Sequence, residues 1–155
     1  MSVQVMTRDD DAAAVCIKNP PDVPGLAFRV FQTVTDCGAE ADMILQTGSC
    51  ARGKDIVFTV PEDTANAVEK ALGELLADCS GAEISVLRQC TRLCVTGDGL
   101  CGRTGSAAEL LRCLWDAGIV LCGVTVSDVK MTLALSREQA ERAADIIAEK
   151  MLFEE

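Results

Sequence analysis

The chain has 155 residues, of which 49% are hydrophobic, 25% charged and only 3% aromatic, and its formal net charge is −10 at pH 7. This composition is typical of a globular protein with one domain or two small ones, and the acidic balance argues against nucleic acid and membrane surfaces, which are bound through clustered Lys and Arg. The sequence contains no apolar run of the roughly 20 residues needed to cross a bilayer and no export signal, so we expect a cytoplasmic protein.

Hydrophobic periodicity predicts a strand at the N-terminus, a strand–helix–strand–strand–helix–strand series after it, and a second series that stops one strand short. The elements of the first part are strands at 3–7 and 13–18, a helix at 24–37, strands at 39–46 and 55–60, a helix at 63–77 and a strand at 82–87. Those of the second part are a strand at 91–96, a helix at 105–117, strands at 119–127 and 130–135 and a helix at 137–151. Ser136 and Gln139 are spaced as a capping box at the start of that last helix.

The two series are an internal duplication, because segment 25–38 aligns with segment 105–118 at one offset of about 80 residues. Identical residues recur as Gly25 and Gly105, Ala27 and Ala107, Asp36 and Asp116, and Gly38 and Gly118. The missing last strand of the second series can be supplied by the spare strand at the N-terminus. We therefore predict an α+β fold of two ferredoxin-like β-α-β-β-α-β units, residues 12–88 and residues 89–155 with 1–8, in which the N-terminal strand completes the C-terminal unit.

Gly97, Gly99 and Gly102 have the G-x-G-x-x-G spacing of a dinucleotide-binding turn. Such a site requires parallel strands joined by crossover helices, with an acidic residue at the end of the second strand. Here the strand predicted after the following helix returns at once as an antiparallel hairpin, and the corresponding loop of the first series has no such glycines. The context does not support the motif, so we expect no nucleotide cofactor.

The chain has nine Cys and no His. No C-x-x-C pair occurs, and Cys90 and Cys94 in one strand are about 13 Å apart, too far to share a zinc ion. Without His, most acid–base and triad arrangements are not available. We therefore expect reduced, mainly structural thiols, no metal site and no catalytic residue. An enzyme of its own would need an unexpected thiol mechanism, for which Cys101 in the glycine-rich loop is the candidate.

Several segments carry a resemblance to a known family. They are residues 22–31, 42–46 and 55–61 in the first half, and Gly97-Asp-Gly99, Gly105 and residues 127–130 in the second. Together with the duplicated order of elements, these segments resemble the tandem ACT region of aspartate kinases. The resemblance covers essentially the whole chain, is closer in the first half, and lacks the kinase portion that would normally precede the region.

In that family the ACT pair binds a pathway amino acid, commonly lysine or threonine, and binding changes the activity of the kinase portion. The resemblance implies that this chain binds a free amino acid through its first unit at Asp22, Pro24, Gly25, Leu26, Ala27 and Gln46. The residue types suit that ligand: a helix N-terminus favours an α-carboxylate, an Asp can pair with an ammonium group, and a Gln offers both a donor and an acceptor.

The second unit departs from the family pattern. The family usually has an asparagine directly after the Ala-Gly-Ile turn, whereas this chain has Val120 and then Leu121 at the ligand-binding positions that the resemblance implies. Segment 100–105, Leu-Cys-Gly-Arg-Thr-Gly, also lacks the family's proline. One wall of the effector pocket is then apolar, which leaves a more hydrophobic amino acid, or no ligand, as alternatives to lysine and threonine.

The leading hypothesis is a non-catalytic regulatory protein that senses an amino acid and controls an associated enzyme such as an aspartate kinase. Expected partners are the free effector, a second copy in a homodimer formed by pairing of edge strands, and an aspartate kinase catalytic subunit. The alternatives are an assembly module that binds no ligand and a regulatory fragment of a longer aspartate kinase.

Overall fold

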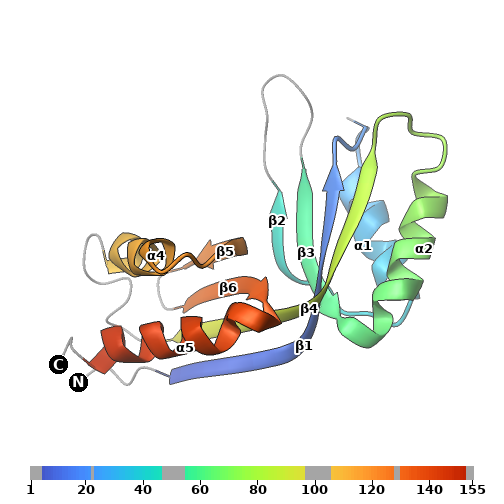
Figure 1. Ribbon diagram of the computed structural model, residues 1–155. Coiled ribbons are helices and arrows are strands. Elements are labelled where there is room, and N and C mark those ends of the chain that lie inside the picture. The colour runs from blue at the N-terminus through green and yellow to red at the C-terminus, as the bar shows by residue number, and fades with distance from the viewer. Residues whose placement is uncertain (1–4, 22, 47–54, 97–105, 128–129, 153–155) are drawn as a thin grey trace. The chain divides into compact units, whose positions relative to one another are not determined.

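The computed structural model describes residues 5–21, 23–46, 55–96, 106–127 and 130–152 (Figure 1). The elements in chain order are β1 (Val5–Lys18), α1 (Leu26–Asp36), β2 (Asp42–Gln46), β3 (Ile56–Pro61), the 3₁₀ turn η1 (Glu62–Thr64), α2 (Ala65–Leu75), β4 (Glu83–Thr96), α4 (Ser106–Asp116), β5 (Leu121–Val126), β6 (Lys130–Ser136) and α5 (Arg137–Leu152).

The strands form one sheet in the order β2-β3-β1-β4-β6-β5, and the pairs β1–β3, β2–β3, β4–β6 and β5–β6 are all antiparallel. The chain divides into two compact units, residues 11–89 (the first unit) and residues 1–10 with 90–155 (the second unit). The start of β1 therefore belongs to the second unit. The predicted fold class is confirmed: the chain is α+β with two ferredoxin-like units, and its N-terminal strand completes the C-terminal one.

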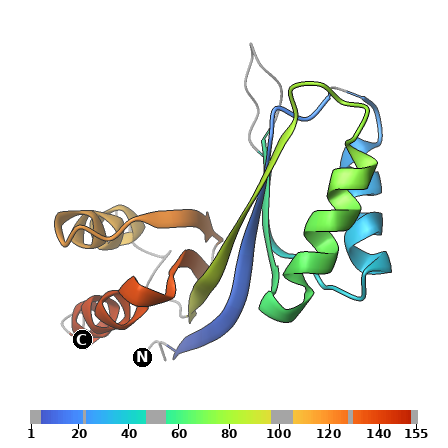
Figure 2. The same cartoon turned by 45° about the vertical axis from the view of Figure 1, so that its right-hand side comes forward.

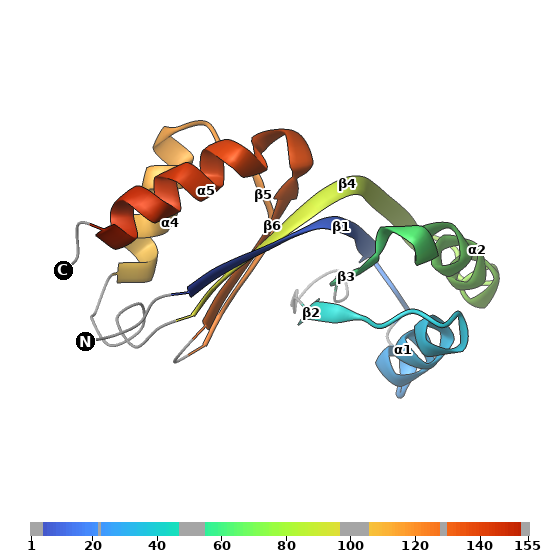
Figure 3. The same ribbon diagram turned by 90° about the horizontal axis from the view of Figure 1, so that it is seen from below.

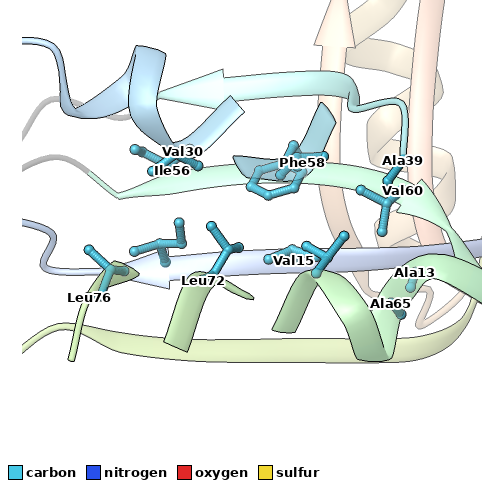
Figure 4. Close-up of a cluster of buried hydrophobic side chains, with 13 residues drawn as sticks. Ala13, Val15, Val30, Ala39, Ile56, Phe58, Val60, Ala65, Leu72 and Leu76 are labelled. Atoms are coloured by element: carbon cyan, nitrogen blue, oxygen red, sulfur yellow. The ribbon is translucent and has the colours of Figure 1, made fainter. Parts of the chain in front are cut away.

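In the first unit, α1 and α2 cover one face of the strands (Figure 2). Apolar side chains at helical spacing on the two helices meet alternate side chains of β1 and β3, as the two periodicities require. Figure 4 shows Val30 and Leu72 of the helices directed toward Val15, Ile56 and Phe58 of the strands, all five of which are buried.

The second unit repeats this construction with α4 and α5, which lie side by side (Figure 3). Its buried core comes from β4, β6, the two helices and the turn after α4, with Met6 of β1 packed against it. The core residues are Leu93, Val95, Leu110, Leu114, Ile119, Met131, Leu133, Leu135, Ala143 and Ile147. Each unit thus buries one helical layer against one face of its own strands.

Two of the breaks predicted between strands are wrong. The strands predicted at 3–7 and 13–18 are one continuous strand, β1, and those predicted at 82–87 and 91–96 are one continuous strand, β4. The segment between the first two is rich in Asp, a residue that is depleted in strands and common in turns, yet it is extended.

Arg8, Asp9 and Asp10 of β1 have partners within the second unit, and this pairing explains the continuous strand. The Arg8 guanidinium donates from Nε to Asp10 Oδ1 at 2.7 Å, and the Thr91 hydroxyl donates to the same oxygen at 2.8 Å. The Arg92 guanidinium donates to Asp9 Oδ2 at 2.8 Å, and Arg137 Nε donates to the carbonyl oxygen of Asp10 at 2.9 Å. These bonds stabilise an extended segment whose local sequence favours a turn.

The Asp10 carboxylate gives this network a pH dependence. Its pKa lies below the ordinary aspartate value, first because Arg8 donates a hydrogen bond to it and second because Thr91 does. A lowered pKa in the folded state stabilises the fold above the ordinary pKa, and this contribution disappears as the pH falls through the folded value.

We therefore expect Asp10→Asn to be less stable than the wild type at pH 7, and to lose stability less steeply than the wild type between about pH 5 and pH 2. Urea unfolding at a series of pH values measures both quantities. Asp145→Asn, on an exposed part of α5, is the matched control and should keep the wild-type acid slope. An unchanged acid slope in Asp10→Asn would contradict this role of the network.

Candidate functional site

The predicted first-unit residues Pro24 to Ala27 form the start of α1. Gly25 precedes the helix with φ 79°, a left-handed conformation that favours glycine, and its carbonyl accepts from the Arg29 amide at 3.1 Å. The Leu26 amide donates to the Val23 carbonyl at 3.2 Å. The helix therefore begins at Leu26, two residues later than the periodicity predicts, and Pro24 and Gly25 are exposed in the turn before it.

Gln46 lies at the end of the sheet from which the chain passes to α1. It is the last residue of β2 and pairs with Ile56, which in turn pairs with Ile17 near the end of β1. The backbone of Gln46 and the loop that leads to α1 thus share one end of the first unit. Asp22 and the side chain of Gln46 lie outside the described residues, so their predicted contact with a ligand stays a prediction.

In the second unit, Val120 and Leu121 lie in an open apolar groove between α4 and β5. The groove has a volume of about 400 Å³. Its lining residues are Leu111, Leu114, Trp115, Ile119, Val120, Leu121 and Val124. Trp115 is 77% exposed and Val120 is 67% exposed, values that are high for large apolar side chains in a globular protein. The side chains that line the groove beside both predicted residues are thus aliphatic, apart from the indole of Trp115.

Gln139, which the sequence analysis placed in a helix capping box, lies at the edge of this groove. Gln139, in the first turn of α5, accepts at Oε1 from the Val120 amide at 3.0 Å and donates from Nε2 to the Gly118 carbonyl at 3.2 Å. The capping box predicted for Ser136 and Gln139 is therefore wrong, because the carboxamide is engaged by the turn between α4 and β5. Gly118, at φ 77°, ends α4 and turns the chain toward β5.

The reactivity of two described cysteines is lowered by their surroundings. Burial raises the pKa of the Cys90 thiol to about 11 and also raises that of Cys122, which disfavours the reactive thiolate at both. Within the described part of the chain, no group of His, Cys, Asp and Glu is arranged to hold a metal ion, and no helix there is long and apolar enough to span a membrane. Cys101 and the glycines at 97–102 lie outside the described residues.

No protein-family model matches the chain, but individual curated proteins do. An aspartokinase of Thermus thermophilus is 29% identical over 145 residues, which are 92% of this chain and 35% of that protein. An aspartate kinase of Pseudomonas fluorescens is 25% identical over 133 residues, 86% of this chain and 32% of that protein. The chain spans about a third of the length of the curated relatives that it matches.

Two solved regulatory subunits match over a larger share of both chains. The regulatory subunit of aspartate kinase from Thermus thermophilus, in its ligand-free form, superposes with a TM-score of 0.82 at 26% identity over 94% of this chain and 95% of that one. The regulatory subunit from Thermus flavus gives a TM-score of 0.83 at 26% identity over 94% and 96%. An aspartate kinase from Synechocystis gives 0.84 at 27% identity, but this chain covers only 26% of it.

Proposed function

The chain resembles the tandem ACT regulatory region of aspartate kinases over nearly its whole length, and from this premise we propose that it binds a free amino acid and thereby controls an aspartate kinase. The observation that carries the proposal is the match, at a TM-score of 0.82, to a regulatory subunit that is covered almost completely by this chain. The chain itself has no catalytic role in this proposal.

The geometry of the first unit supports an amino-acid site at the start of α1. The first turn of an α-helix has backbone amides without intrahelical acceptors and carries the positive end of the helix dipole, both of which suit a carboxylate. Asp22 supplies a negative charge for the ligand's ammonium group, and Gln46 supplies a donor and an acceptor from the neighbouring strand end. Pro24 and Gly25 fix the turn that presents the amide of Ala27, whereas the Leu26 amide donates to the Val23 carbonyl.

The second unit supports an apolar contact with the ligand's side chain. Val120 and Leu121 lie in a groove with a volume within the range of small-molecule sites, about 300 to 1,000 Å³. A charged side chain in such an apolar groove would lose its hydration without an opposite charge to replace it. This favours an effector with an apolar side chain over lysine at the second unit.

The described edge strands give a reason to expect a homodimer. β2 and β5 lie at the two ends of the sheet, and each exposes a large apolar residue, Ile44 and Val126. An edge strand with unpaired backbone groups and exposed apolar side chains favours association with a second chain. A monomeric mass in light scattering, with and without amino acids, would contradict the dimer.

The same exposed residues favour one alternative function, an assembly module that holds a kinase subunit without binding an effector. The two functions differ in their response to free amino acids, because a ligand that binds only the folded state stabilises it.

We expect one amino acid, or a small chemically related group, to raise the thermal unfolding temperature when all twenty are tested at millimolar concentration. A ligand at 100 times its dissociation constant adds about 2.7 kcal/mol to the free energy of unfolding, a shift of a few degrees. The shift should be lost in Asp22→Ala and retained in Asp78→Ala, an exposed aspartate of the same unit. A flat response across all twenty would contradict amino-acid sensing and favour the assembly module.

A further inference from the structure

The Gln139 carboxamide bonds the backbone of the second unit in the way that the N–H and C=O of one residue in a neighbouring strand would. It accepts from the Val120 amide and donates to the Gly118 carbonyl, two residues earlier. One planar group therefore satisfies a donor and an acceptor that lie next to each other on the turn between α4 and β5. Without Gln139, this donor–acceptor pair would face water or a ligand.

The main chain of a free α-amino acid offers the same pair of functions. Its carboxylate accepts a hydrogen bond, as Gln139 Oε1 does, and its ammonium group donates one, as Gln139 Nε2 does. The two functional groups are close together in the ligand, as the oxygen and nitrogen are in a carboxamide. A charged acceptor and a charged donor also form stronger hydrogen bonds than the neutral groups of a carboxamide.

The apolar groove begins at the same backbone segment. Ile119 and Val120 belong both to the turn that Gln139 holds and to the lining of the groove, and the remaining lining residues contribute only apolar side chains and one indole. A ligand whose main chain replaced the carboxamide would have this groove available for its side chain. An aliphatic or aromatic side chain fits that surface, whereas an ammonium side chain does not.

We infer that Gln139 is a built-in competitor of the effector: it occupies the backbone position at Gly118 and Val120 that an α-amino acid with an apolar side chain takes when it binds the second unit. The inference rests on the amino-acid binding proposed above and specifies the ligand class and the residue that sets its affinity. Binding releases Gln139 from the turn. Because Gln139 lies on α5, the occupied and empty states differ in whether α5 is tied to the turn between α4 and β5.

Two substitutions at one position test the competition. Gln139→Met keeps the length of the side chain but removes both hydrogen bonds, so an apolar amino acid should bind about tenfold more tightly than to the wild type. Gln139→Glu keeps the acceptor, loses the donor and places a negative charge against the ligand's carboxylate, so binding should weaken or disappear. Calorimetric titration with leucine, valine, methionine and phenylalanine measures the affinities, and thermal unfolding confirms that each variant is folded.

The opposite directions of the two effects separate competition from a purely structural role. A Gln139 that only holds the turn would give weaker or unchanged binding in both variants, and that result would overturn the inference. If the wild type binds an amino acid with an affinity that depends on Asp22 and is unchanged in both Gln139 variants, the proposed function stands and the inference fails. If none of the twenty amino acids binds the wild type or Gln139→Met, both fail.

Discussion

The fold depends on two long strands, β1 and β4, which each pass from one unit of the duplicated chain into the other. In β1 the polar residues at the crossing have partners that stabilise the extended conformation. The carboxylates of Asp9 and Asp10 are bound by Arg92, Arg8 and Thr91, and Arg137 binds the Asp10 carbonyl. The ion pairs are partly exposed, so their main consequence is conformational: they fix an extended backbone where the sequence alone favours a turn.

This constraint also explains which parts of the fold could be predicted from the sequence. The helices, the hairpins and the completion of the second unit by the N-terminal strand follow from local periodicity and from the repeat, both of which are visible in the chain. The continuity of β1 could not be predicted, because its carboxylates find partners some 80 residues away. The local sequence, rich in Asp, favours a turn there, and tertiary pairing overrides that preference.

The candidate site, too, could be predicted only in the part that depends on local sequence. The resemblance pointed to Val120 and Leu121, whereas the groove beside them depends also on Leu111 and Trp115 of α4, which line it from another element. Gln139 has the local spacing of a helix cap, and the same side chain can instead reach a turn about 20 residues earlier in the chain. Whether Gln139 caps its own helix or bonds the turn depends on how α4, β5 and α5 are arranged in the fold. The spacing of residues along the chain does not predict that arrangement.

The two units have diverged in a way that agrees with a regulatory protein built by duplication. The first keeps a turn and helix start suited to the charged main chain of an amino acid, while the second has an apolar groove beside a backbone pair that its own glutamine occupies. Backbone amide spectra recorded during titration with apolar amino acids test this account most directly. We expect the largest chemical-shift changes of the second unit at Gly118, Ile119 and Val120, and changes at none of them with saturating ligand would contradict it.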